Sequence, residues 1–564
     1  MTKSNSPKNI LFIMFDQLRF DYLSCYGHPT LETPNIDKIA QQGVRFTNAY
    51  VQSPVCGSSR MSYYTGRYVH SHGAAFNNFP LKAGEQTIGD HLRKIGVNAF
   101  LLGKTHMKVD SEGLERLGIS KESIIGARIA ECGFDAIMRD DGLWAEGPDG
   151  FYAEMKSPYN EYLKSKGYSG HNPWSSHANA GITQSGNVAS GWFMKNARLP
   201  ANIREEDSET PWLTTQMINF LNQESKKKSA DKNPWLMHLS YIKPHWPYIV
   251  PAPYNSMYTK DDILPVNRSE NEITQGVNPI YKAFTENIIG KAFKKDEVRE
   301  EVIPAYMGLI KQCDDQMGRL FNHMTKLGYM ENTMIVICSD HGDYLGDHWL
   351  GEKDLFHEPS VKTPLIIYDP SKEANSSRGK SVDLLVESID LAATFVDSYG
   401  EKIPSHILEG YSLLPIIHSK NTKYWREFVV SEYDYSTSGI PKKLNISAKD
   451  ARLFMVFDGR YKLIHAEGNF QPMIFDLYND PDEINDLNAQ INTNHRVQKV
   501  VERLYEYLAR WSRRPSQRTT VSEYDILEMR GQSQKRGITL GLYDGSEIDP
   551  ALYKKYKGKA KKII

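Results

Sequence analysis

The chain has 564 residues, more than one hydrophobic core usually holds, so we expect two domains or one large domain with an appendage. Its 68 basic and 69 acidic residues give a net charge of −1, which excludes a global field that would attract nucleic acid or an anionic membrane. Five scattered cysteines argue against a disulfide framework, no apolar run is long enough to span a bilayer, and the polar start leads directly into a strand. We therefore expect a cytoplasmic protein.

Apolar and polar segments alternate from residue 9 to residue 102 in the manner of an α/β fold. Residues 9–15 are a continuous apolar run, typical of a central parallel strand that is covered on both faces. Thr33 and Pro34 fit the start of a helix, and Gly43 fits its end. The whole pattern predicts strands at 9–15, 44–51 and 97–102 and helices at 34–42 and 87–95.

The regular pattern stops between residue 107 and residue 232, where Gly, Asn, Ser and Trp are frequent. We expect an irregular insertion there that shapes the substrate site. Its four tryptophans, each a candidate ligand contact or a packing residue, are Trp144, Trp174, Trp192 and Trp212. The α/β pattern then resumes and completes a catalytic domain over residues 1–400, with strands at 234–241, 333–338 and 364–368 and helices at 302–327 and 391–399.

Residues 401–510 predict a small C-terminal α+β domain. Its sheet is expected to be antiparallel with four short strands, at 428–431, 453–457, 461–465 and 473–476. A helix at 497–510 follows the last of them. Residues 511–564 form a polar C-terminal arm with a lysine-rich end, which we interpret as solvated.

A loop of small residues at 53–60 precedes a helix predicted at 61–67 and contains Cys56 and Arg60. Backbone amides and the positive end of a helix dipole favour an anion at such a place, and Arg60 adds a positive charge. Cys56 is therefore a candidate nucleophile, although an inert, packed cysteine is the alternative interpretation.

Several polar residues follow predicted buried strands, at the edge where open α/β sheets place their ligands. They are Asp16, Gln17, Lys104, His106, His245, Asp340 and His341. Carboxylate, amide and imidazole ligands together suit a divalent ion such as Ca²⁺, Mg²⁺ or Mn²⁺. The basic residues of this set, with Arg60 and Lys353, suit a tetrahedral anion. The residues predict a metal-dependent hydrolase of sulfate, phosphate or phosphonate esters.

Five segments in this order resemble the sulfatase branch of the alkaline phosphatase superfamily: 9–17, 56–67, 103–106, 243–247 and 339–353. Within that branch the chain resembles bacterial phosphonate monoester hydrolases that also act as arylsulfatases. The Asp16–Gln17 pair, residues 339–348 and residues 510–513 carry this second likeness. The resemblance implies an alkaline-phosphatase-like, mainly parallel mixed sheet flanked by helices, with a small C-terminal domain.

The resemblance also implies roles for individual residues. A formylglycine-generating enzyme would oxidise Cys56 to formylglycine, the nucleophile, and one Ca²⁺ or Mn²⁺ ion would be held by Asp16, Gln17, Asp340, His341 and the modified Cys56. Arg60 matches the residue that braces the nucleophile, while Lys353 and His245 match groups that hold the substrate oxyanion and assist the leaving group. Lys104 and His106 match the Gly-Lys-x-His positions of sulfatases, and Asn77 matches a substrate-contacting amide. The family implies a homo-oligomer, a dimer or a tetramer.

Ser58 stands where the family's maturation signal has Pro or Ala, so two further hypotheses stay open. The first hypothesis is formylglycine-dependent hydrolysis of sulfate esters, phosphonate monoesters or phosphate diesters, with a small anionic ester as substrate. The second is a phosphodiesterase or phosphatase that uses unmodified Cys56 or a metal-activated water. The third is a non-catalytic homologue that binds an anion.

Overall fold

A computed structural model describes residues 8–142, 157–274, 277–420, 422, 425–514, 520–530, 545–547 and 550–551. Its centre is an eight-stranded sheet with the strand order β13-β2-β12-β11-β1-β10-β5-β7. The strands are β1 (Asn9–Asp16), β2 (Val44–Phe46), β5 (Asn98–Gly103), β7 (Asp135–Arg139), β10 (Trp235–Pro244), β11 (Thr333–Ser339), β12 (Leu365–Tyr368) and β13 (Lys380–Val382). Only β12 runs antiparallel to its neighbours, so the mixed, mainly parallel sheet expected from the sequence is confirmed.

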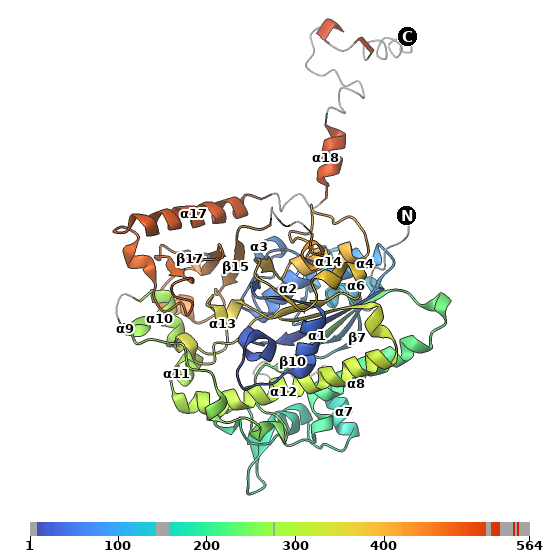
Figure 1. The fold of residues 1–564 in the computed structure, drawn as a ribbon, viewed down its shortest axis with the longest axis vertical. Helices are drawn as coiled ribbons and strands as arrows, with labels where there is room; N and C mark the ends of the chain where they lie inside the picture. Colours follow the sequence, from blue (N-terminus) through green and yellow to red (C-terminus); the bar gives the residue numbers. More distant parts are fainter. Residues whose placement is uncertain are drawn as a thin grey trace.

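Strand β1 lies in the middle of this sheet and is buried along its whole length. Phe12 points to a core shared with α2 (Cys56–Thr65), α4 (Ile88–Arg93) and α14 (Asp390–Ser398). Ile13 points to the other face, which is covered by α1 (Pro34–Gln42), α8 (Glu209–Lys226) and α12 (Asp296–Lys326). Figure 1 shows these two helical layers on either side of the sheet. Because helices bury both faces, the strand is apolar at every position instead of alternating.

The start of α1 is held by a residue that is distant in sequence. Thr33, the expected N-cap, accepts no hydrogen bond from a backbone N–H of the helix, and its hydroxyl donates to Asp37 Oδ1 (3.2 Å). The buried carboxylate of Asp314 on α12 instead accepts hydrogen bonds from the backbone N–H groups of Asn35 (3.1 Å) and Ile36 (2.8 Å). Two of the unpaired donors at this helix end are thereby satisfied, and α1 is fixed to α12.

Three predicted elements differ from the structure. The strand expected at 44–51 is divided into β2 and β3 (Ala49–Tyr50), and β3 pairs with β14 (Val386–Glu387) outside the central sheet. The helix expected from residue 61 already begins at Cys56. The insertion expected to be irregular contains the long helix α8, the short helices α5 (Ser111–Arg116), α6 (Ile124–Ala130) and α7 (Pro158–Ser165), and β7 of the central sheet.

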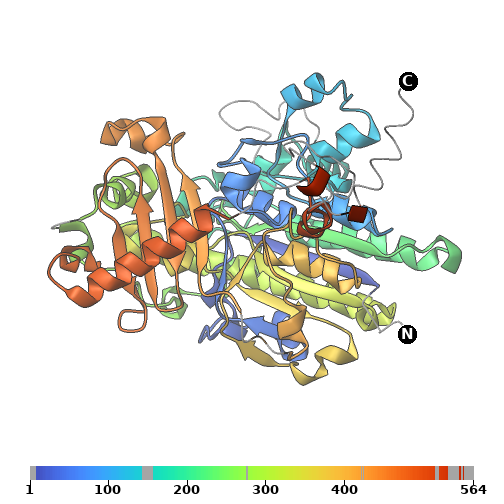
Figure 2. The same ribbon diagram turned by 90° about the horizontal axis from the view of Figure 1, so that it is seen from above.

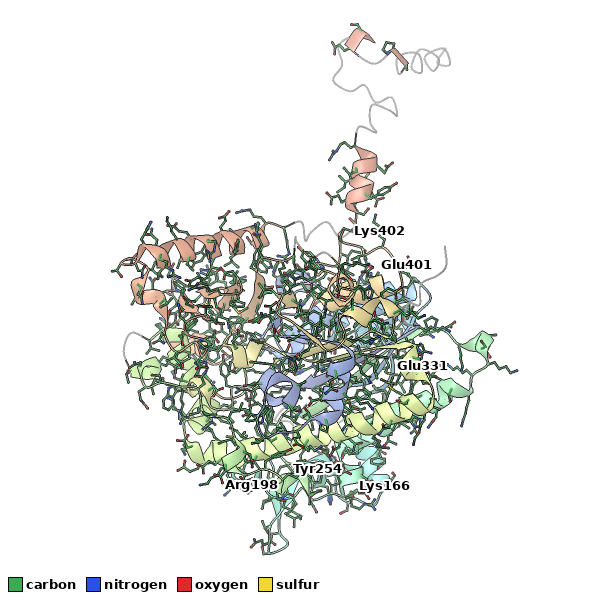
Figure 3. The ribbon with its side chains drawn as sticks, in the orientation of Figure 1. Lys166, Arg198, Tyr254, Glu331, Glu401 and Lys402 are labelled. Carbon is green, nitrogen blue, oxygen red and sulfur yellow. The ribbon has the colours of Figure 1, made fainter. Side chains whose placement is uncertain are left out.

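The insertion is anchored on the outer side of α12, where Figure 3 labels Arg198 and Tyr254. Gln312 of α12 donates a side-chain hydrogen bond to Ser208 Oγ of the insertion (2.9 Å), and Tyr254, in the segment after β10, donates one to Asp315 of α12 (3.0 Å). The backbone carbonyl of Arg198 accepts one from the side-chain amide of Asn255 (3.0 Å). These contacts give the insertion a fixed position on the sheet domain. Trp174 and Trp212 are buried in it, Trp192 is exposed, and Trp144 lies outside the described residues.

The C-terminal part contains the predicted four-stranded antiparallel sheet, with the strands β15 (Val429–Asp434), β16 (Arg452–Phe457), β17 (Tyr461–Ala466) and β18 (Met473–Asp476). Val430 and Leu463 on one face pack with α17 (His495–Ser512), which lies across the sheet in Figure 2. Val429 and Met455 on the other face belong to the same core as Phe12 of β1. The small sheet therefore packs directly on the larger domain, while the boundary at residue 400 stays a prediction.

Within the described parts of the chain, no helix combines the length and apolarity needed to cross a bilayer.

Candidate active site

Cys56 is the first residue of α2 and is fully buried. The helix is positioned by three hydrogen bonds: the Gly57 N–H donates to Asn77 Oδ1 (2.8 Å), the Ser59 hydroxyl to the Asp340 carbonyl (2.6 Å) and the Tyr63 hydroxyl to the Ser339 carbonyl (2.9 Å). The last two of these bonds connect α2 to the end of β11. Cys56 consequently sits in the positive field of a helix N-terminus.

Two residues near Cys56 are used within the protein itself. Asn77 Oδ1 accepts a hydrogen bond from the Gly57 N–H at the N-terminus of α2. The contact is close, because a Cβ atom at position 57 would lie only 2.9 Å from Asn77 Oδ1. The Ser58 hydroxyl donates to Ser53 Oγ (2.6 Å) and to the Val55 carbonyl (3.2 Å). Asn77 therefore caps the helix that carries Cys56, and its contact with substrate stays a prediction.

The structure brings four of the predicted metal ligands together. Donor atoms of Asp16, Cys56, Asp340 and His341 all lie within 4.8 Å of one another, and all four residues are buried. His341 Nε2 is 3.0 Å from Cys56 Sγ and 3.7 Å from Asp16 Oδ1. Strands β1 and β11 are parallel neighbours, so the residues at their carboxyl ends meet at one edge of the sheet.

Gln17 completes this set in an unusual backbone conformation, with φ of 64°. Its side-chain amide donates to a carboxylate oxygen of Asp343 and to the Tyr248 hydroxyl, the latter at 3.2 Å. Its Oε1 is buried and has no hydrogen-bond partner among the described residues. A buried carbonyl oxygen without a donor costs free energy unless a ligand completes it. Together with two carboxylates, an imidazole and a thiol, this free oxygen fits a divalent cation.

Arg60 and Lys104 pair with the ligand carboxylates and do not point to an open substrate site. Arg60 Nε donates to Asp340 Oδ2 (2.8 Å), and its Nη2 lies 3.2 Å from Asp16 Oδ2. Lys104 Nζ is 2.5 Å from the same Asp16 oxygen. Burial alone would raise the pKa of Asp16, but Lys104, His245 and Arg60 hold it well below its usual value. Both residues therefore stabilise the ligand carboxylates, and their contact with a substrate anion stays a prediction.

Lys353 and His245 lie on the other side of Cys56. Lys353 Nζ donates to Cys56 Sγ (3.0 Å) and lies 3.5 Å from His245 Nε2. The other ring nitrogen of His245, Nδ1, donates to the Trp246 carbonyl (2.7 Å). Burial lowers the pKa of His245 well below its usual value; the charge of Asp16 opposes this shift, and the charges of Lys353 and Lys104 add to it. Because Nδ1 carries the proton that the Trp246 carbonyl accepts, Nε2 is the ring nitrogen that lies next to Lys353.

His106 stands at the same edge, in a left-handed backbone conformation with φ of 55°. Its backbone N–H and that of Thr105 donate to Asp141 Oδ1, at 3.1 and 2.9 Å. Burial and the charge of Lys104 lower the pKa of His106, while an interaction with the Cys56 thiol raises it. The structure therefore brings His106 to the nucleophile, and its role in turnover stays a prediction.

Four further residues support the site and carry no predicted role. Asp343 and Tyr248 orient Gln17, and the Ser240 hydroxyl accepts a hydrogen bond from Arg60 Nη1 (2.8 Å). Tyr433 of the C-terminal sheet donates to Asp354, the residue after Lys353, at 2.9 Å. Asp343 and Ser240 could have been suspected because they lie close to strand ends. No local signal marks Tyr433, which is far from the site in sequence.

Known proteins resemble the chain along most of its length. The family described as Sulfatase matches residues 8–140 and 158–400, and the family described as N-sulphoglucosamine sulphohydrolase, C-terminal, matches residues 346–511. An arylsulfatase of Clostridium perfringens is 29% identical over 504 residues, which cover 87% of this chain and 92% of the relative. The multifunctional alkaline phosphatase superfamily protein PehA of Trinickia caryophylli is 27% identical over 519 residues, covering 85% and 91%.

The fold has equally extensive counterparts among solved structures. The phosphonate monoester hydrolase SpPMH from Silicibacter pomeroyi superimposes with a TM-score of 0.75 and 26% identity, covering 89% of this chain and 95% of that one. The match to the first family includes the ends of β1 and β11 and the whole of α2, which carry the clustered donor atoms. The resemblance found in the sequence is thus confirmed, and the chain belongs to the sulfatase family of ester hydrolases, within the alkaline phosphatase superfamily.

Proposed function

We propose that this chain hydrolyses sulfate esters and phosphonate monoesters, with a formylglycine made from Cys56 as the nucleophile. The observation that carries the proposal is the position of Cys56. It begins a buried helix, 3.0 Å from Lys353 Nζ and 3.0 Å from His341 Nε2, among the donors that suit a divalent ion. An arylsulfatase among the relatives and a phosphonate monoester hydrolase among the structural neighbours support these substrate classes.

The charges of the site favour an anionic ester. Lys353 is a cation 3.0 Å from Cys56 Sγ, and a divalent ion among Asp16, Asp340 and His341 would add two further positive charges. Sulfate esters, phosphonate monoesters and phosphate diesters carry one negative charge at neutral pH, whereas a phosphate monoester carries about two. These charges would attract all four classes, so the proposed substrate classes rest on the relatives and not on the charges of the site.

Asp16, Gln17, Asp340 and His341, with the modified residue 56, would hold one Ca²⁺ or Mn²⁺ ion. When bound, such an ion supplies a Lewis acid that polarises an oxygen of the ester. The chain's own residues fix the geometry around it: Arg60 holds both carboxylates, and Asp343 holds the Gln17 amide. This arrangement is in place before substrate arrives, which is the condition for electrostatic preorganisation.

Lys353 and His245 are the groups we assign to the substrate. Lys353 Nζ, 3.0 Å from the nucleophile atom of residue 56, would bind an oxygen of the ester. A bound anion would offset the charges of Lys353 and Lys104 that lower the pKa of His245. His245 could then carry a proton on Nε2 and donate it to the leaving oxygen.

The experiment that tests this proposal follows residue 56 by mass and by turnover. In active protein, the mass of the peptide that contains position 56 should correspond to formylglycine at this position instead of cysteine. Cys56→Ala should abolish hydrolysis of 4-nitrophenyl sulfate and of an aryl phosphonate monoester, while Cys313→Ala, a buried cysteine on α12, should retain it. Active protein with a wholly unmodified Cys56 peptide would contradict the proposal.

Ser58 supports a second candidate, a phosphodiesterase that uses the unmodified thiol. A serine replaces the expected Pro or Ala in the maturation signal, and its hydroxyl is engaged by Ser53 and Val55. The Cys56→Ser variant separates the two candidates in a host that lacks formylglycine-generating enzyme. The second candidate predicts that wild-type protein from this host stays active on phosphate diesters and that the serine variant keeps a substantial rate.

A further inference from the structure

Two tryptophans form a continuous contact path from His245 to the protein surface. The ring of His245 lies against that of Trp246, with centroids 4.7 Å apart, and Trp192 meets Trp246 edge to face at 5.3 Å. Trp174 stands behind Trp192 at 6.2 Å and is buried, with its Nε1 donating to Glu209 (2.6 Å). We name Trp246 and Trp192 the aromatic wall.

Two features of the aromatic wall are unexplained by packing alone. Trp192 leaves 45% of its surface exposed, although a large aromatic side chain gains most when it is buried. The indole Nε1 of Trp246 is buried and has no hydrogen-bond partner among the described residues, whereas a buried indole N–H usually finds one. Both features suit a surface that is completed by a ligand.

We propose that the aromatic wall binds the leaving group of the ester, and that this group presents a flat ring face, either an aryl ring or the C–H face of a pyranose. This inference rests on the proposed function, because there His245 serves the leaving oxygen. The group attached to that oxygen would lie next to His245, and Trp246 is the ring whose centroid is 4.7 Å from that of His245. Trp246 then offers a stacking face with an N–H donor, and Trp192 extends the surface outwards.

The geometry separates this role from the chemical step. His245 Nδ1 bonds to the backbone carbonyl of Trp246, which every side-chain substitution at position 246 retains. Among the described residues, Trp192 makes its ring contacts with Trp174 and Trp246 and none with His245, and it lies at the surface. Changes in the aromatic wall should therefore alter binding of the leaving group while the groups around residue 56 stay in place.

The test compares ring-bearing and ring-free ligands in Trp192→Ala and Trp246→Phe. Phe193→Ala, which removes an exposed ring next in sequence, is the control for disturbance of the loop. For 4-nitrophenyl sulfate and for a 6-O-sulfated glucosamine, kcat/KM of each variant is divided by that of wild type. The ring-free arm is the inhibition constant of inorganic sulfate. We expect Trp192→Ala to lower kcat/KM about tenfold for one of the two esters, through a higher KM. The inhibition constant of inorganic sulfate should not change, and Phe193→Ala should keep the wild-type kcat/KM.

A loss confined to the aryl ester identifies an aryl leaving group, and a loss confined to the sugar ester identifies a pyranose. Unchanged kcat/KM for both esters overturns the inference, as does an equal weakening of inorganic sulfate or an equal loss in Phe193→Ala. Calorimetric binding of both esters to Cys56→Ala, with and without Trp192→Ala, needs no turnover. If wild type hydrolyses neither ester, the proposed function fails, and this binding comparison still decides the inference.

Discussion

A single hydroxyl group connects the C-terminal sheet to the lysine beside the nucleophile. Lys353 lies between Glu352 and Asp354, whose φ angles of 56° and 106° are in the left-handed region that residues other than glycine disfavour. The Tyr433 hydroxyl on β15 donates to Asp354 Oδ1 at 2.9 Å, and the Tyr344 N–H donates to the Glu352 carbonyl at 2.7 Å. These contacts hold the backbone of the Lys353 segment in a costly conformation. We therefore predict that Tyr433→Phe impairs catalysis although residue 433 is distant from the substrate.

The size of the effect follows from what Tyr433→Phe leaves behind. Asp354 loses the hydroxyl donor, and for this partly buried carboxyl group the loss costs at most about 1.5–3 kcal/mol. A change of about 1.4 kcal/mol in the activation free energy changes the rate tenfold. If the whole cost appears as misplacement of Lys353, kcat/KM falls by at most about 100-fold. We expect a loss of about tenfold in kcat/KM, with the remainder lowering the free energy of unfolding.

Tyr435, two residues after Tyr433 in the chain, provides a matched control. It follows the end of β15, is buried like Tyr433, and its hydroxyl has no hydrogen-bond partner among the described residues. Tyr435→Phe therefore removes one buried oxygen without breaking a contact and should leave turnover unchanged. The assay measures kcat and KM for 4-nitrophenyl sulfate together with urea unfolding of both variants. Equal kcat/KM values for Tyr433→Phe and Tyr435→Phe would refute the reasoning.

Three further predictions concern the ion site and the scaffold. Asp343→Ala removes one of the two acceptors of the Gln17 amide and should weaken Ca²⁺ or Mn²⁺ binding about 10- to 100-fold in calorimetric titrations of metal-free protein, whereas wild-type affinity would show that Gln17 needs no orientation by Asp343. Removing divalent ions with a chelator should abolish ester hydrolysis and adding Ca²⁺ or Mn²⁺ should restore it; activity that survives thorough chelation contradicts the ion's role. Asp314→Ala removes the acceptor for Asn35 and Ile36 and should lower the free energy of unfolding by about 1–3 kcal/mol in urea titrations, with unchanged kcat; an undiminished free energy would mean that water replaces the carboxylate.

The metal-ligand cluster was the part of the site that the sequence predicted best. Asp16 follows one apolar run, and Asp340 and His341 follow another. Buried parallel strands are recognisable by such runs, and the carboxyl ends of neighbouring parallel strands meet at one edge. These two rules bring the ligands together without any knowledge of the loops. The donor atoms within 4.8 Å of one another agree with that reasoning.

The start of α2 was missed because the helix has no recognisable periodicity. Every residue from Cys56 to Thr65 is buried, and the first four are small or polar. An exposed helix shows an apolar stripe that repeats along one face, but a helix buried on all sides shows none. Only Met61 and the residues after it have helical character in the sequence, so the prediction began there.

Roles that depend on partners far apart in sequence could not be predicted from local patterns. Arg60 and Lys104 were expected near the substrate, because a sequence shows a positive charge without showing which carboxylate it meets. Tyr433 and Asp354 are in contact only because the small sheet packs on the larger domain. The cytoplasmic location and the homo-oligomeric state remain predictions for the same reason, since both depend on partners outside the chain.

The buried charges at the strand ends limit what each basic residue can do. Asp16 and Asp340 are paired with Arg60 and Lys104 at distances of 2.5 to 3.2 Å, and all four side chains are fully buried. Breaking one partner out of a buried ion pair costs about 3–5 kcal/mol, because it leaves an uncompensated charge in the interior. Arg60 and Lys104 therefore stabilise the carboxylates, and their contact with a substrate anion stays a prediction. Lys353, 3.0 Å from Cys56 Sγ and 3.5 Å from His245 Nε2, is the cation that we propose for the anion.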